Sequence, residues 1–320
     1  MTESPTNLEL LAGDSEADPM LPTTNGPGPM LSPALAAAPR QPLLRTIRGR
    51  FHGSTLVGGI LVALVLVVAM GAPLFQIHPP QLQDVSNRLA SPAFAGGSWS
   101  HPLGTDGLGR DIWSRIIWGL RTSLIIAIPA VILAAAFGTA VGTLAGYFGR
   151  GIDTLLMRIT DIQMAFPFII LAIAILSIAQ PGPIVLILVL SLSAWPIYAR
   201  VVRSVAMVDS RSEYVLAARA MGAGHGRIIG RYLLRNLGLS IAVLSTLDIA
   251  TMIVLEAMLS FLGLGTQPPS ISLGSVMSDG REYMPFRIWW ITTLPGFAIL
   301  ITLLGLNLMG DGLQTKRDSR

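Results

Sequence analysis

The sequence predicts an all-α integral membrane protein with six transmembrane helices and with both termini in the cytoplasm. The first observation is composition: 52% of the 320 residues are hydrophobic, the mean hydropathy is +0.62 and 12% are charged, against about 25% charged in a soluble domain. The second is the length of the uncharged stretches, since about 20 residues of helix cross a hydrocarbon core. The third is the uneven distribution of arginine between the connecting loops.

The chain divides into three predicted regions. Residues 1–40 are rich in Pro, Ala, Ser, Thr and Gly and lack an apolar period, so they cannot bury enough surface to offset their ordering entropy. We therefore expect a disordered cytoplasmic tail, and not a secretory signal peptide, which would start its apolar run much earlier. Residues 41–118 should hold the first transmembrane helix and an external loop. Residues 119–320 should form a five-helix core.

Five apolar stretches hold the six predicted spans. They are Gly53–Gln83, Thr122–Gly149, Ile162–Ala199, Leu237–Leu264 and Ile288–Gly310. The third stretch is too long for one span and contains Pro181-Gly182-Pro183 in its middle. Because proline lacks an amide proton and glycine favours turns, this tripeptide predicts a tight hairpin between two spans.

The basic residues predict the orientation. Sixteen of the 22 lie in the tail, the loop between spans two and three, the loop between spans four and five, and the C-terminus; six lie in the other loops. Cytoplasmic loops carry the excess of arginine and lysine, so both termini should be cytoplasmic. Tryptophans then lie at the outer ends of spans two and six, at the interface that indole rings favour; they are Trp113, Trp118, Trp289 and Trp290.

The loop between spans four and five, at about 205–236, is the longest predicted cytoplasmic connection. Ser212 precedes a run of helix formers and is a candidate N-cap. Gly222 and Gly224 should end that short helix, and the basic segment Arg227–Asn236 then leads into span five. The loop is thus predicted to be a helix, a glycine turn and a second helix.

Known catalytic and metal-binding patterns are missing. The sequence has no GxxxxGK[ST], no HExxH and no GxSxG, it has no cysteine, and its one lysine is Lys316. No catalytic residue is therefore expected. The sequence also lacks the phosphate-binding loop that would be needed to bind ATP. The four histidines show no ligand spacing, so no metal site is predicted; they are His52, His78, His101 and His225.

Four segments carry a resemblance to a known family. The predicted cytoplasmic loop holds Leu216-Ala217-Ala218, Gly222 and Tyr232-Leu233-Leu234-Arg235, and three other segments read HPLGTDGLGRDIWSRIIWGLRTSL from His101, EAMLSFLGLGTQPP from Glu256 and LNLMGDGLQ from Leu306. Over about 41–318 the chain resembles the C-type permease subunit of dipeptide, oligopeptide and nickel ABC importers, a binding-protein-dependent transport system inner membrane component. The resemblance implies the type I ABC importer (MetI-like) fold.

The resemblance also implies function and partners. The chain would form, with a homologous permease, the pathway for di- or oligopeptide uptake across a bacterial inner membrane. Two ABC ATPase subunits would bind ATP and Mg²⁺, so no cofactor is expected in this chain, and an extracytoplasmic binding protein would deliver the peptide. A nucleic-acid partner is not expected. Import of a nickel chelate or another small solute is an alternative, as is a stand-alone secondary transporter; an intramembrane enzyme would need a constellation that the sequence lacks.

The resemblance assigns the cytoplasmic loop as the ATPase-coupling loop. Ala217, Ala218, Gly222 and Leu234 match the family motif, while Leu216 replaces its glutamate. Glu213, one helical turn earlier, is a candidate substitute for that acid. Arg227, in the basic segment, is also predicted to belong to the ATPase-coupling loop. Gly222 is expected to adopt a turn conformation that a side chain would disfavour.

Two further groups of residues lie within the spans. Asp248 and Glu256 are eight residues apart and so share a helix face, and each charge at the membrane centre costs about 2.5–3.5 kcal/mol. They either line the translocation pathway or pair with polar neighbours; for Asp248 we favour the structural role. Gly138, Gly142 and Gly146 have the four-residue spacing that lets helices approach closely, and we favour packing within the chain over contact with a partner permease.

Overall fold

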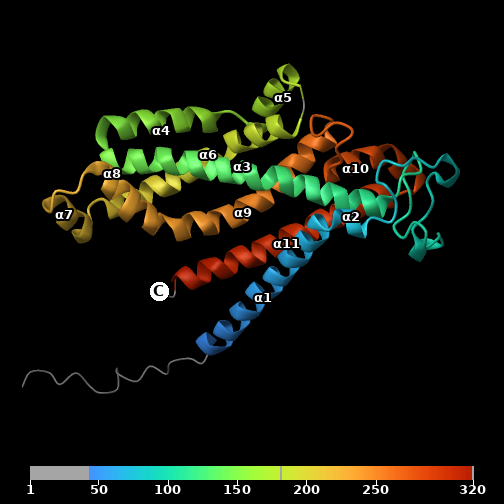
Figure 1. Ribbon diagram of the computed structural model, residues 1–320, viewed down its shortest axis with the longest axis horizontal. Coiled ribbons are helices and arrows are strands. Elements are labelled where there is room, and N and C mark those ends of the chain that lie inside the picture. Colours follow the sequence, from blue (N-terminus) through green and yellow to red (C-terminus); the bar gives the residue numbers. More distant parts are fainter. Residues whose placement is uncertain (1–42, 181, 319–320) are drawn as a thin grey trace, which may run out of the picture. The chain divides into compact units, whose positions relative to one another are not determined.

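The computed structural model describes residues 43–180 and 182–318, and in these residues it is helical, with a single β-bridge between Thr105 and Asp111. The chain divides into two units, 1–44 and 45–320, and the second unit holds the packed helices. The predicted disordered tail, 1–40, lies outside the described residues. Figure 1 shows the order of the elements along the chain.

The first transmembrane helix ends earlier than the apolar stretch Gly53–Gln83 predicts. Helix α1 spans Leu43–Met70 and the one-turn helix α2 spans Ala72–Phe75. Residues 76–111 form an irregular segment that holds two 3-10 helices, η2 (Val85–Asn87) and η3 (Ala93–Ala95). We call it the outer segment, after the side of the membrane on which the sequence predicts it. The helix thus stops well before Gln83, at the Gly71-Ala72-Pro73 sequence, where proline cannot continue a helix.

Helix α3, Ile112–Phe148, is 37 residues long and begins ten residues before the predicted Thr122. The Asp111 side chain accepts a hydrogen bond from the Ser114 backbone N–H, 2.9 Å away, and so caps the first turn. At 1.5 Å per residue the helix is about 55 Å long. It is therefore longer than a membrane core is thick and extends beyond it.

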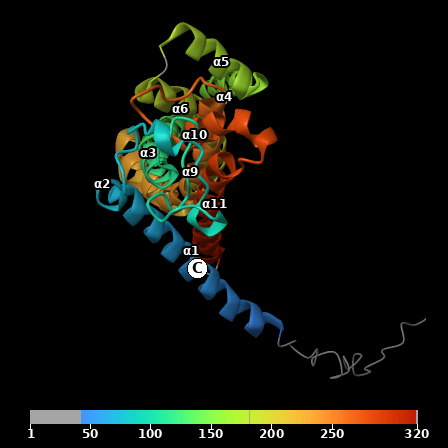
Figure 2. The ribbon, with the colours of Figure 1, turned by 90° about the vertical axis from the view of Figure 1, so that its right-hand side faces the viewer.

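The predicted hairpin of two spans is only partly present. Helices α4 (Arg150–Ala165) and α5 (Phe168–Ile178) are bent by 84° at a short break, and α6 spans Pro183–Asp209. The first of these two spans, expected between Ile162 and the turn at Pro181, does not start as one straight helix, because Pro167 lies at the break between α4 and α5. In both views α4 lies beside α3 and α6 (Figures 1 and 2).

The C-terminal half is a series of helices of different lengths. They are α7 (Glu213–Ala220), α8 (His225–Arg227), a π-helical turn η4 (Ile228–Leu233), α9 (Leu234–Phe261), α10 (Leu273–Gly280), the 3-10 helix η5 (Arg281–Phe286) and α11 (Trp290–Asp318). Helices α9 and α11 correspond to the predicted spans five and six.

The chain is a multi-pass membrane protein. Within the described residues four helical stretches are long and apolar enough to cross a membrane: Ile112–Phe148, Pro183–Asp209, Ser240–Phe261 and Trp290–Gly312. The bent pair α4–α5 makes five if it is one broken span, and α1 adds the shorter apolar stretch Thr55–Met70. The total of six spans stays a prediction.

Helices α3 and α6 form the closest packed pair of the core. A Cβ atom added to Gly138 would lie 2.4 Å from the Trp195 carbonyl oxygen, and one added to Gly142 would lie 2.4 Å from the Ala199 carbonyl oxygen. At Gly146 the distance to the Arg203 carbonyl oxygen would be 2.7 Å. The three glycines therefore bring the α3 backbone against α6 within the chain, as small residues do in membrane helix pairs.

Candidate functional site

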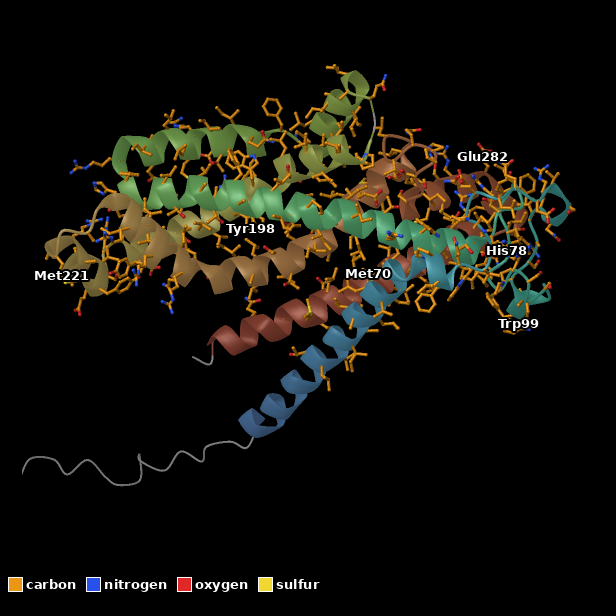
Figure 3. The ribbon with its side chains drawn as sticks, viewed as in Figure 1. Met70, His78, Trp99, Tyr198, Met221 and Glu282 are labelled. Atoms are coloured by element: carbon orange, nitrogen blue, oxygen red, sulfur yellow. The ribbon has the colours of Figure 1, made fainter. Side chains whose placement is uncertain are left out.

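The predicted coupling loop and the outer segment lie at opposite ends of the long helices. Figure 3 places Met221, at the tip of the loop, at one end, and His78 and Trp99 of the outer segment at the other. We call residues 210–233, which connect α6 to α9, the coupling segment. Helix α3 reaches from one end to the other, with Asp111 before its first turn and Tyr147 in its last.

A Schellman motif ends α7 at a fixed angle. The Gly222 N–H donates to the Arg219 carbonyl at 2.9 Å and the Ala223 N–H donates to the Ala218 carbonyl at 3.0 Å. Gly222 has φ +81°, a left-handed conformation that residues with a side chain rarely adopt. At the start of the helix Ser212 occupies the N-cap position, but its hydroxyl donates to the Asp209 carbonyl at 2.6 Å instead of capping α7.

One face of α7 is held against the core. Val215 is buried in a small apolar cluster with Tyr147 of α3, Ala206 of α6 and, from η4, Ile228 and Leu233. Polar contacts support the same joint: the Tyr147 hydroxyl lies 2.7 Å from Nδ1 of His225. The Arg219 guanidinium lies 5.1 Å from the centre of the Tyr147 ring, within the range of a cation–π contact. A force on α7 would therefore act on the ends of α3 and α6.

The other face of α7 is exposed. Leu216 is 52% exposed and Met221 79% exposed, and Glu213, Ala217 and Gly222 are exposed as well. Arg227 and Leu234 also lie on the surface. Ala218 differs, because it is buried at 1% exposure. Ala218 thus lies on the inward face of α7, four residues before the left-handed Gly222, and its contact with a partner stays a prediction.

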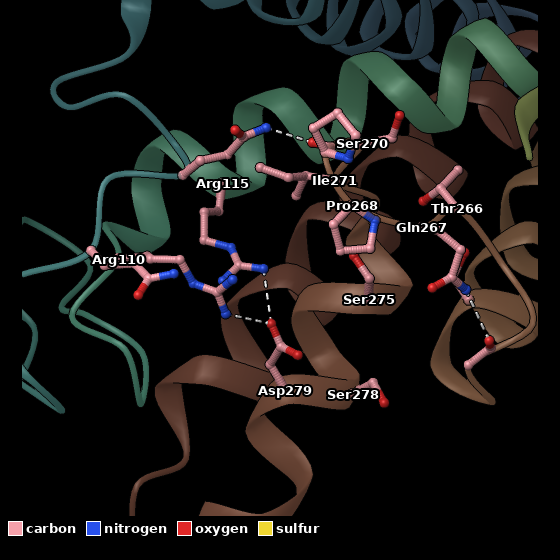
Figure 4. Close-up of a pocket in the computed structure, with 15 residues that line it drawn as sticks. Arg110, Arg115, Thr266, Gln267, Pro268, Ser270, Ile271, Ser275, Ser278 and Asp279 are labelled. Atoms are coloured by element: carbon pink, nitrogen blue, oxygen red, sulfur yellow. Dashed lines mark hydrogen bonds and ion pairs between the residues drawn. The ribbon is translucent and has the colours of Figure 1, made fainter.

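A pocket of about 690 Å³ opens at the outer end (Figure 4). Arg110 reaches it from just before α3 and Arg115 from the first turns of α3. Both donate to Oδ2 of Asp279 on α10, at 2.8 and 2.9 Å. Both arginines also pair with the buried Asp106. Two arginines against two aspartates leave the walls close to neutral. The sequence motif from His101 contains both arginines, but no local signal connects Asp279 to them.

Two side-chain donors in this pocket have no partner. Nε of Arg115 and Oγ1 of Thr266 are buried and make no hydrogen bond within the described part of the chain. On the opposite wall the Gln81 amide donates to the Pro269 carbonyl at 2.6 Å. Buried donors without acceptors are rare in native proteins, so these two atoms are exceptions in the wall of the pocket.

The two acids of α9 have different surroundings. Glu256 is fully buried, and its carboxylate accepts hydrogen bonds from the Ser123 and Ser260 hydroxyls, each at 2.7 Å. Asp248 is half-buried, and its Oδ2 has no hydrogen-bond partner among the described residues. Glu256 therefore fastens α9 to α3, while Asp248 keeps an unsatisfied oxygen.

The comparison with protein families matches residues 138–320 to the binding-protein-dependent transport system inner membrane component. The dipeptide transport system permease protein DppC of Alkalihalophilus pseudofirmus is 40% identical over 83% of this chain and 85% of its own length. The di/tripeptide transport system permease protein DppC of Pseudomonas aeruginosa is 37% identical, over 84% and 89%. The probable D,D-dipeptide transport system permease protein DdpC of Escherichia coli is 34% identical, over 83% and 87%.

Solved structures with a similar fold include an ABC transporter. The inward-facing MetNI methionine ABC transporter matches with a TM-score of 0.52 and 20% identity, over 64% of this chain and 96% of the matched chain. At that identity the likeness concerns the fold alone. This similar fold agrees with the type I ABC importer (MetI-like) fold that the family resemblance implies.

Proposed function

Because the chain belongs to the family of binding-protein-dependent transport system inner membrane components, we propose that it is the transmembrane permease subunit of an ATP-driven peptide importer. The observation that carries the proposal is the coupling segment, an exposed helix on a glycine turn with its inner face locked to the ends of α3 and α6. A partner protein bound to this surface could move α7, and the contacts of α7 with α3 and α6 would transmit that movement to the membrane helices.

The ATPase subunits would dock on the exposed face of α7. Leu216, Ala217 and Met221 offer an apolar surface there, and Glu213 and Arg227 offer charges at its edges. ATP and Mg²⁺ would bind in those subunits, since the sequence carries no phosphate-binding loop of its own. Each nucleotide-driven movement of α7 would reach the outer pocket through α3, which carries Tyr147 at one end and Arg115 at the other.

A homologous permease and an extracytoplasmic binding protein would complete the complex. Large apolar side chains stay exposed along α4 and α5, among them Ile162, Phe166 and Ile170 at 61%, 61% and 63% exposure. Surfaces of this kind suit lipid or a second membrane subunit. The binding protein would approach the outer segment, next to the pocket that Arg110 and Arg115 line.

Short peptides are the proposed substrates. Three relatives of the chain carry names that refer to dipeptides, di/tripeptides and D,D-dipeptides, and polar side chains such as Arg110, Gln267 and Ser278 line the outer pocket. A nickel chelate or another small solute is the alternative. The sequence favours a structural role for Asp248, but its unsatisfied oxygen makes us prefer it now as the pathway residue that meets a peptide amino group. Glu256 is the weaker candidate because both of its oxygens accept serine hydroxyls.

Reconstitution of the complete transporter in proteoliposomes tests this function. We expect labelled dipeptide to accumulate only with ATP, Mg²⁺ and the ATPase subunits present, and we expect unlabelled dipeptide, not a nickel chelate, to compete. Uptake by this chain alone, driven by an ion gradient without ATP, would support the secondary transporter instead. Uptake that only the nickel chelate suppresses would keep the importer and replace the substrate.

A further inference from the structure

Two histidines and an aspartate from separate parts of the outer segment come together in the fold. His78 follows α2, His101 lies in the loop before α3, and Asp111 is the N-cap residue of α3. One ligand atom from each lies within 4.8 Å of the other two. Nδ1 of His101 is 3.1 Å from Oδ1 of Asp111, and the His78 and His101 rings have centroids 4.7 Å apart.

The surroundings hold this cluster in place. The Ser114 hydroxyl donates to Oδ2 of Asp111 at 2.7 Å, which leaves Oδ1 facing His101. The same Ser114 oxygen accepts hydrogen bonds from the Ile77 and His78 backbone N–H groups, at 3.1 and 3.3 Å. One hydroxyl thus fixes the backbone of one histidine and the carboxylate of the aspartate. Outer contacts of this kind orient the ligands in metal sites.

The His78 side chain carries an unused atom. Its Nδ1 is buried and has no hydrogen-bond partner in the described part of the chain. A buried polar atom without a partner loses the hydrogen bond that water would give it and needs an explanation. A metal ion would supply the missing partner, since a neutral imidazole nitrogen is a common metal ligand.

We propose that His78, His101 and Asp111 bind a divalent transition metal, with Zn²⁺ as the ion that fits best. Two imidazoles and one carboxylate are a set of ligands that Zn²⁺ accepts, with a fourth position left for water or an external donor. Ligand atoms around tetrahedral Zn²⁺ lie about 3.3 Å apart, given bonds of about 2.0 Å. The His101–Asp111 pair already has nearly this separation. The ligand atom of His78 lies within 4.8 Å of the other two, so it has to move in by at most about 1.5 Å.

Metal binding would exchange one interaction for another in the cluster. The ion would replace the contact between Nδ1 of His101 and Oδ1 of Asp111, and the neutral imidazole would carry its hydrogen on Nε2. The ion would then join the chain after α2 to the loop at His101 and to the first turn of α3. That turn also positions Arg115, so the metal would stiffen the frame of the outer pocket. The chemistry does not depend on which solute is transported.

Zn²⁺ titration of the full-length chain tests the proposal. The chain is purified without a polyhistidine tag in detergent micelles and titrated against a chromophoric chelator. We expect one Zn²⁺ per wild-type chain and an affinity at least about tenfold weaker in His78→Gln and in His101→Gln, since even loss of an outer contact costs about 10–100-fold. His225→Gln is the matched control, because His225 contacts Tyr147 at the other end of α3, and it should bind as the wild type does.

Thermal unfolding distinguishes loss of the site from loss of the fold. With chelator present, His78→Gln should unfold close to the wild-type temperature, because it loses the ring contact with His101 but no hydrogen bond of Nδ1 among the described residues. Added Zn²⁺ should raise the melting temperature of the wild type and of His225→Gln but not of His78→Gln. The proposal is overturned if wild type binds no more tightly than His78→Gln and His101→Gln, or if His225→Gln is weakened equally.

Discussion

Replacing Gly222 by valine perturbs the coupling segment through its backbone alone. Gly222 has φ +81°, and a Cβ atom placed there would have no atom within 4 Å. A new side chain therefore meets no neighbour, and the cost is that of a left-handed conformation. That cost is about 1–2 kcal/mol for an ordinary L-residue and larger for a β-branched one. Asparagine, which tolerates this conformation, should cost less.

The expected effect follows from the size of that cost. A loss of about 2 kcal/mol lowers the equilibrium constant for the native turn about 30-fold, so the exposed face of α7 would be held in its orientation less firmly. In reconstituted transporter we expect Gly222→Val to reduce peptide transported per ATP hydrolysed severalfold or more, Gly222→Ala to reduce it less and Gly222→Asn least. The assay measures ATP hydrolysis and uptake on the same vesicles.

Gly224 provides the matched control for this series. It is two residues away and equally free of neighbours, but its φ is −70° and its ψ is 160°, an extended conformation that valine favours. Gly224→Val should keep the wild-type ratio of peptide to ATP. The reasoning fails if Gly224→Val uncouples as strongly as Gly222→Val, or if Gly222→Val transports normally.

Three further predictions concern packing and buried polar groups, each measured by thermal unfolding in detergent. Gly142→Leu forces a side chain into the α6 backbone 2.4 Å away and should lower the free energy of unfolding by about 1–3 kcal/mol. Gly151→Leu, in open space, should leave it almost unchanged, and equal effects would refute the close packing of α3 on α6. Arg115→Ala removes a cation that is 4% exposed and should lower the free energy of unfolding by about 3 kcal/mol. Arg200→Ala, at 47% exposure, should lower it by about 0.5 kcal/mol, and the reverse order would contradict the buried pair. Glu256→Ala leaves two buried serine hydroxyls without their acceptor and should cost about 1–3 kcal/mol; unchanged stability would show that these hydrogen bonds contribute nothing.

Local signals were enough for part of the fold. The apolar stretches located α3, α6, α9 and α11, and the glycines after Met221 predicted the end of α7, because these features depend on a few neighbouring residues. The family resemblance of the coupling loop rests on the same short segment. The inward position of Ala218 could not be read from that motif, since it depends on which face of α7 meets Tyr147.

Other features depend on contacts between distant residues or on a breaker hidden in an apolar stretch. Pro167 lies at the bend between α4 and α5, but its apolar neighbours concealed it within a long hydrophobic run. Asp279 meets Arg115 across 164 positions, and no periodicity predicts that contact. His78 and His101 lack ligand spacing in the sequence, yet the folded outer segment brings them together. Such clusters become visible only once the path of the loop is known.

The central claim is that the coupling segment binds an ATPase on the cytoplasmic side of the membrane. The chain has no cysteine, so Met221→Cys and Trp99→Cys, at 79% and 81% exposure, each introduce one reactive thiol at opposite ends of the molecule (Figure 3). In intact cells an impermeant maleimide should label Trp99→Cys and spare Met221→Cys, and a short crosslinker should join Met221→Cys to the ATPase subunit. Labelling of Met221→Cys from outside, or no crosslink in an active complex, would contradict the account.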